Sequence, residues 1–208
     1  AGADAADAIA VQSAALSADV LNGALEHVEI SEALDIGLRV FVGQRQANIS
    51  AGKGDAATLT DMAERAVAMA REAPLDPALG LADPEQLTPD TDVTALELAD
   101  PGAAPDAAAL EADARRAETA AAAVIGVSQV QSSAAGYSRS DIALAATNGF
   151  TARYGRTSRS VSAVAITGEG KGMERDHAFE SRVFAADLPP PEQIGTQAGE
   201  RTVARAGA

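Results

Sequence analysis

The fold is decided by residues 158–187, which read SRSVSAVAITGEGKGMERDHAFESRVFAAD. A glycine-rich turn at residues 168–172 divides this stretch into two halves, each with the composition of a strand. After the turn, Met173, Phe179 and Val183 are apolar, whereas most of the even-numbered positions among them are charged. An alternation with a period of two residues is typical of a strand that buries one face. The stretch therefore predicts a long antiparallel hairpin whose Phe179 face lies toward the core.

Alternating patterns and turn residues predict further short strands on the N-terminal side of this hairpin. They fall at residues 8–16, 18–22, 25–32, 34–42, 46–51, 124–133, 141–147 and 150–154. Asn22-Gly23 and Asn148-Gly149 are suited to tight hairpin turns, because both residue types tolerate positive φ. The sequence therefore predicts several antiparallel meanders.

Helical spacing of apolar residues predicts three helices, at residues 61–73, 105–123 and 192–205. Thr60 is the expected N-cap of the first helix. Six of the nine prolines lie between residues 74 and 105, so we expect an extended connection there. No sequence after the last helix is left to cover its apolar side. Strands with short turns and segregated helices favour an α+β fold of antiparallel sheets in two layers.

Composition limits the function classes. The 208 residues carry 16 basic and 30 acidic side chains, a net charge of −14, and 5 of the basic and 19 of the acidic residues lie before residue 111. Such a chain repels nucleic-acid phosphates, so no direct nucleic-acid partner is expected. The absence of Cys removes disulfides and thiolate chemistry. No apolar run is long enough to predict a membrane span.

Motifs for catalysis and metal binding are weak. Gly168-Glu-Gly-Lys-Gly172 joins two strands instead of opening a helix, so a hairpin turn is favoured over a phosphate loop. His27 and His177 stand far apart, outside any metal-ligand spacing, so neither a metal ligand nor a catalytic residue is expected in this chain. Arg153, Arg156 and Arg159 form the only basic cluster, and we expect them to pair with local acids.

The most distinctive charged string is Glu174-Arg175-Asp176-His177. In a strand, Glu174 and Asp176 share one face, whereas Arg175 and His177 share the other with Phe179. An exposed, charged strand face is the ordinary interpretation. The functional interpretation is that these four residues contact a partner subunit or a ligand.

The string GMERDHAF at 172–179 resembles the TldD/PmbA family, whose members are often labelled modulators of DNA gyrase. The entry strand AADAIAV at 5–11, the segment LDIGLRVF at 34–41 and the prolines Pro74 and Pro77 resemble the same family in the same order. Within the family, the resemblance is to the PmbA (TldE) branch. It extends over essentially the whole chain, but only over the N-terminal half of a family member.

The resemblance implies a cytoplasmic subunit that pairs with a TldD-like subunit, or with a copy of itself, as a metalloprotease of unfolded or precursor peptides. It implies zinc only in a TldD-type partner, on a His-Glu-x-x-x-His helix that this chain lacks. Residues 1–187 would then form an N-terminal α+β domain containing the proline-rich connection 74–105. Residues 188–208 would form a helix leading to a C-terminal domain. The alternative is a non-catalytic module that binds an extended peptide at an exposed sheet edge.

Overall fold

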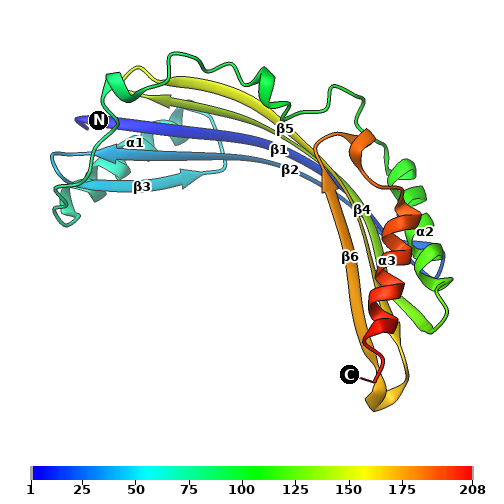
Figure 1. Ribbon diagram of the computed structural model, residues 1–208. Helices are drawn as coiled ribbons and strands as arrows, with labels where there is room; N and C mark the ends of the chain where they lie inside the picture. The colour runs from blue at the N-terminus through cyan, green and yellow to red at the C-terminus, as the bar shows by residue number, and fades with distance from the viewer. Residues whose placement is uncertain (1, 208) are drawn as a thin grey trace. The chain divides into compact units, whose positions relative to one another are not determined.

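The computed structural model describes residues 2–207 (Figure 1). Within them, six strands form one antiparallel sheet in the order β3-β2-β1-β4-β5-β6, accompanied by three α-helices. The strands are β1 (Ala5–Leu21), β2 (Ala24–Phe41), β3 (Gln46–Ala51), β4 (Val127–Ala146), β5 (Thr151–Thr167) and β6 (Glu174–Arg182). The helices are α1 (Ala56–Glu72), α2 (Ala107–Ala122) and α3 (Pro191–Ala204). The predicted α+β class with antiparallel meanders is confirmed.

Two three-stranded meanders build the sheet, β1 to β3 and β4 to β6, and their first strands are neighbours in its centre. Asn22 (φ 55°) and Gly23 (φ 72°) make the turn between β1 and β2, as their tolerance of positive φ predicts. The hairpin of residues 158–187 is confirmed. Its β5 and β6 pair from Arg159 opposite Arg182 to Thr167 opposite Glu174.

Strands β1, β2 and β4 are longer than predicted. The expected breaks at Ser17 and Ala33 do not occur, because both residues lie inside continuous strands. Most of the predicted strands 124–133 and 141–147 lies within the single strand β4, which begins at Val127 and ends at Ala146. Small and hydroxyl side chains fit a pleated surface without ending it, so a polar position inside a strand is no reliable boundary.

The connection between α1 and α2 contains no strand and no α-helix among its described residues, in line with its proline content. Two short 3₁₀ turns occupy Pro84–Gln86 and Thr94–Leu96. By their contacts, the described residues fall into two compact units. The first contains the chain up to Ser13, Glu32–Leu96 and Ser140–Gly155, and the second contains Ala14–Ser31, Glu97–Arg139 and the chain from Arg156. The expected further domain after residues 188–208 stays a prediction.

In the first unit, α1 packs on one face of the sheet through Ala66, Val67 and Ala70, which contact the buried Val40 and Ala47. The helix begins four residues before the expected Thr60 cap. Asp55 is the N-cap instead, and its carboxylate accepts hydrogen bonds from the backbone N–H and the hydroxyl of Thr58. An aspartate satisfies free N–H groups at a helix start better than a threonine inside the first turns.

In the second unit, α2 and α3 lie side by side on one face of the sheet (Figure 1). Leu110, Ala114, Ala117 and Ala121 from α2 are buried with Ile194 and Ala198 from α3. The expectation that nothing covers the apolar side of the last helix is therefore wrong. Elements earlier in the chain, α2 and β6, cover it, which depends on tertiary packing that the local sequence does not show.

Candidate functional site

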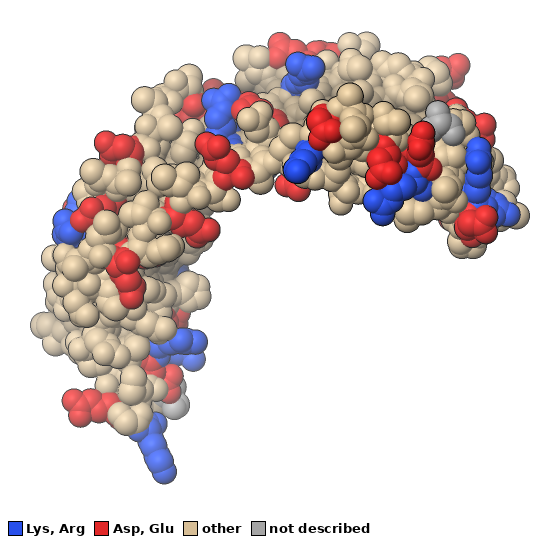
Figure 2. Space-filling model, turned by 180° about the vertical axis from the view of Figure 1, so that it is seen from behind, with Lys and Arg blue, Asp and Glu red and all other residues tan. Residues whose placement is uncertain are grey.

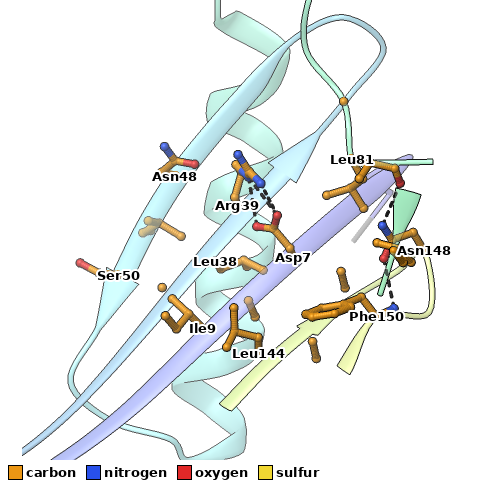
Figure 3. A pocket seen from close by; sticks show the side chains of 18 residues that line it. Asp7, Ile9, Leu38, Arg39, Asn48, Ser50, Leu81, Leu144, Asn148 and Phe150 are labelled. Carbon is orange, nitrogen blue, oxygen red and sulfur yellow. Dashed lines mark hydrogen bonds and ion pairs between the residues drawn. The ribbon is translucent and has the colours of Figure 1, made fainter. Parts of the chain in front are cut away.

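The first unit has an open groove of about 660 Å³ on the sheet face away from α1 (Figure 3). Strands β1 to β4 form its floor, and Leu81 and Leu87 of the proline-rich connection line its side. Ile9, Leu144 and Phe150 supply much of its apolar surface. A concave, mostly apolar surface with a few polar groups is the usual character of a ligand site.

The main polar group of this groove is an ion pair between neighbouring strands. The Arg39 Nε of β2 lies 3.1 Å from both carboxylate oxygens of Asp7 in β1, and its Nη2 donates a further hydrogen bond to the same carboxylate (Figure 3). The guanidinium also lies 5.2 Å from the centroid of the Phe41 ring. The hydrogen bonds to Asp7 raise the pKa of Arg39 above its ordinary value. The pair presents a fixed but electrically neutral feature.

The side of the groove is attached to the rest of the unit through Asn148. Its amide Nδ2 donates to the carbonyl of Ala82 in the connection at 3.0 Å, and its Oδ1 accepts from the Phe150 N–H at 3.2 Å. Near the start of the connection, the Asp76 N–H donates to the carbonyl of Gln44. The turn residue Asn148, expected only to reverse the chain, therefore also positions the connection beside the groove.

The chemistry of the groove is that of binding. Asp7 and Arg39 are the only ionisable residues among its described lining residues, and they neutralise one another. A general acid or base must be free to exchange a proton with a substrate, which this pair is not. The arrangement can accept an apolar group and offer hydrogen bonds at its border from Asn48 and Ser50.

The structure separates the four predicted contact residues onto the two faces of β6. Glu174 and Asp176 are partly covered on the side of α3, where both pair with Arg205 at 3.7 and 3.5 Å. Arg175 and His177 are exposed on the other face together with Phe179, whose exposed fraction is 58%. The prediction that the Phe179 face is the buried one is wrong. The buried residue is Ala178, which lies on the face that packs against Ile194 and Ala198 of α3.

The backbone of Asp176 and His177 is hydrogen-bonded to side chains of α3. The hydroxyl of Thr202 accepts from the Asp176 N–H at 3.1 Å, and Arg201 donates to the carbonyl of His177 at 3.1 Å. The N–H of His177 and the charge of Arg205 lower the pKa of Asp176. On the open face, Arg175 reaches only as far as Gln131 in β4, at 3.3 Å. A role of the four residues in partner or ligand contact stays a prediction.

Among the other sequence motifs, the glycine-rich turn and Arg159 agree with their ordinary interpretations. Residues 168–172 connect β5 to β6, with no α-helix after them that could hold an anion. Arg159 pairs with Asp113 of α2 at 2.6 Å, although this acid lies 46 residues away in the chain, and the pairing of Arg153 and Arg156 with acids stays a prediction. On the face shown in Figure 2, basic side chains lie beside acidic ones instead of gathering in one basic patch. Among residues 2–207, no three His, Cys, Asp or Glu side chains are close enough together to hold a metal ion.

The groove residues Asp7 and Arg39 were not predicted as a site. Both nevertheless lie in the segments 5–11 and 34–41, which carry the family resemblance. The sequence shows Asp7 near the start of one predicted strand and Arg39 near the end of another. That these two residues lie opposite one another depends on the strand register, which appears only in the structure.

Sheet, helices and groove together define an α+β module with an open, mostly apolar groove. Two family models match the chain, PmbA/TldA metallopeptidase domain 1 over residues 6–70 and the PmbA/TldA metallopeptidase central domain over residues 83–206. Because these matches extend over most of its length, the chain belongs to the TldD/PmbA family.

Individual relatives agree with this membership. The chain is 25% identical over 202 residues to metalloprotease PmbA of Escherichia coli O157:H7, with 97% of this chain and 44% of that protein aligned. The crystal structure of TldE from Thermococcus kodakarensis superposes with a TM-score of 0.76 at 14% identity, over 96% of this chain and 44% of that one. A Bacteroides thetaiotaomicron protein described as a modulator of DNA gyrase gives 0.74 at 22% identity, over 99% and 47%. The chain thus spans about half the length of these relatives.

No helix within residues 2–207 is both long enough and apolar enough to cross a membrane.

Proposed function

We propose that this chain is the N-terminal portion of a PmbA/TldE-type subunit of a cytoplasmic, two-subunit metalloprotease that processes or degrades peptides. The observation that carries the proposal is the order of the matched family domains, domain 1 followed by the central domain, in one chain. The similarity to metalloprotease PmbA supports the peptidase class.

The metal of such an enzyme is assigned to the partner. The described residues do not fit a metal ion, because none of their His, Cys, Asp and Glu side chains form a group of three. His177 Nδ1 lies 3.6 Å from the Asp176 carboxylate, but the other carboxylate oxygen faces the cation Arg205 at 3.5 Å and not a further metal ligand. We therefore assign zinc to a TldD-like subunit, and to this chain a role in assembly and substrate binding.

The groove of the first unit supplies a place for the substrate. Its apolar lining suits the side chain of an unfolded peptide, and the neutral Asp7–Arg39 pair adds no net charge that would select among substrates. A processing enzyme that accepts many unfolded peptides would benefit from such unselective binding. We propose that one apolar side chain of the peptide occupies this groove.

The assembly is tested by co-expressing the protein that carries this chain with a TldD-like subunit. We expect a stable complex that contains zinc and cleaves unfolded peptides, with unchanged zinc content in the His27→Ala and His177→Ala variants. The proposal is overturned by stoichiometric zinc in this chain alone that is lost in either variant. Failure to associate with any TldD-like subunit overturns the two-subunit arrangement.

The groove is tested separately with Ile9→Gln, which makes the floor polar. Because the groove is proposed to bind substrate in its ground state, KM for apolar peptides should rise about tenfold, while kcat stays within about twofold. The matched control is Ile125→Gln at a 94% exposed loop position of the second unit. An equal rise in KM for the two variants would exclude the groove as the substrate site.

A further inference from the structure

One open sheet edge of the second unit is the first part of β2. Pairing between β2 and β3 begins only at Ile36, which is opposite Ala51. Because β1 occupies the other side of β2, residues 24–31 have no neighbouring strand on their outer side. Within the described residues, no hydrogen bond from another segment reaches that outer side. A row of unpaired N–H and C=O groups is therefore open to an added strand.

The side chains along this edge are also uncovered. Every residue from Ala24 to Ser31 is exposed except Val28, which is partly buried. Ile30 has an exposed fraction of 74%, and Leu25 has one of 44%. An exposed, regular strand with large apolar side chains is what proteins normally avoid at a free edge, because such an edge pairs with other chains. The presence of Ile30 and Leu25 on this open edge indicates a surface that is covered by a partner.

The negative charge of residues 24–31 favours a basic partner over a second copy of this chain. Glu26 and Glu29 project from it, and Glu32 follows directly, whereas the nearest candidate cation on the strand is His27. A second copy of this chain, paired edge to edge, would bring two such acidic segments together, and opposed like charges destabilise strand pairs. An extended segment with Lys or Arg would gain ion pairs as well as backbone hydrogen bonds.

We propose that residues 24–31 of β2 are a docking edge for an extended, lysine- or arginine-containing polypeptide segment, which binds as an added antiparallel strand. Backbone pairing supplies the attachment, and the carboxylates of Glu26 and Glu29 favour basic sequences. This edge supplies the exposed strand that the alternative function, binding of an extended peptide at a sheet edge, needs. It does not depend on the metalloprotease role, because it uses neither the groove nor a partner's zinc.

The test uses the octapeptide KKTVKKTV, whose lysines fall on both faces when the chain is extended. Binding is followed by amide hydrogen exchange on the 208-residue chain. We expect slower exchange for several amides within residues 24–31. The analogue with Glu in place of every Lys should give no protection, because it repels the edge. The analogue with Pro in place of both valines should also give none, because Pro lacks the N–H that strand pairing needs.

Variants separate this edge from a general effect of net charge. The double variant Glu26→Gln and Glu29→Gln should weaken the affinity for KKTVKKTV by about tenfold, since each exposed pair contributes about 0.7 kcal/mol. The control is Glu64→Gln with Glu72→Gln, which removes the same charge from exposed positions of α1. Both pairs lie on the surface, so the fold is preserved in both variants.

Four outcomes overturn the proposal. They are equal protection by the Glu-containing peptide, equal weakening in the α1 control, protection at the β6 edge instead of residues 24–31, and protection of residues 24–31 that rises with protein concentration without peptide. The last outcome would assign the edge to a second copy of the chain. Loss of binding in Ile30→Lys, with its new cation on the edge, would support the proposal.

Discussion

The guanidinium of Arg39 in β2 is held against the carboxylate of Asp7 in β1, and the two form the only ionisable pair among the described residues that line the groove of the first unit. Next to this pair, Gly37 leaves the space that the Ile9 side chain needs. A Cβ at Gly37 would lie 3.2 Å from the Ile9 Cγ2. Strands β1 and β2 thus contact one another on this face through an ion pair and through the close approach of Ile9 to Gly37.

The coupling between these two charges can be measured directly. Their side chains are 43% and 28% exposed, so we expect a modest coupling free energy of about 1 kcal/mol, at the upper end for exposed pairs because the contact is bidentate. A double-mutant cycle of Asp7→Asn and Arg39→Met, followed by urea unfolding, measures it. A coupling near zero would mean that the pair orients the groove without stabilising it.

The close contact between α2 and α3 depends on Gly195. A Cβ at this position would lie 2.0 Å from the carbonyl oxygen of Ala117, so the helices must separate to accept it. Gly195→Ala should lower the free energy of unfolding by about 3 kcal/mol, despite the better helix propensity of Ala. Gly80→Ala is the control, because a Cβ at Gly80 would meet no other atom within 4 Å. Equal stability of the two variants would contradict this packing.

The turn between β1 and β2 is held by α2. The buried carboxylate of Glu118, 6% exposed, accepts from the Gly23 N–H at 2.8 Å, and Arg115 donates to the Gly23 carbonyl at 3.0 Å. Glu118→Ala should destabilise the fold by about 2 kcal/mol, the range of a hydrogen bond to a charged group. Glu118→Gln keeps an acceptor and should lose less than half as much. Thermal unfolding of the two variants decides this, and the reverse order would contradict it.

Asp100 makes stability depend on pH. Its carboxylate accepts from the N–H groups of Ala185 and Gly102, and these bonds lower its pKa. A lowered folded-state pKa contributes stability above the unfolded value of about 3.9, and this stability is lost as the pH falls through the lowered pKa. Asp100→Asn should therefore shift the urea midpoint at about pH 7 but much less near pH 2. An equal shift at both pH values would exclude the carboxylate charge as the cause.

The hydroxyl of Thr202 joins α3 to β6 and is fully buried. It accepts from the Asp176 N–H and lies 2.8 Å from the carbonyl oxygen of Ala198. Thr202→Val keeps the shape but leaves the Asp176 N–H unpaired, so we expect a loss of about 2 kcal/mol and faster exchange of that amide. Thr202→Ser should retain slow exchange. Slow exchange in both variants would show that the amide has another partner.

Much of the secondary structure could be predicted from local sequence. The turn at Asn22-Gly23 follows from the tolerance of these residues for positive φ, and the hairpin around residues 168–172 follows from alternation on both sides of glycines. The strand lengths could not be predicted, since Ser17 and Ala33 are compatible with both an interior strand position and a boundary. Pairing with neighbouring strands decides between these possibilities.

Much less of the candidate site could be predicted from the sequence. Glu174, Arg175, Asp176 and His177 were found as a string, and alternation correctly separated them into two pairs. Which pair is covered depends on where α3 packs, and α3 begins well beyond this string in the chain. The groove was missed because its residues come from four strands and the proline-rich connection, whose positions relative to one another no local pattern contains.

The sequence by itself determined the α+β class, the turns, the approximate helices and the family, because these depend on short-range patterns and on the order of motifs. Only the tertiary structure decided that Asp7 meets Arg39, that Ala178 and not Phe179 is buried, and that residues 24–31 leave a sheet edge open. These features depend on strand register and helix packing. Both are set by contacts between residues far apart in the chain.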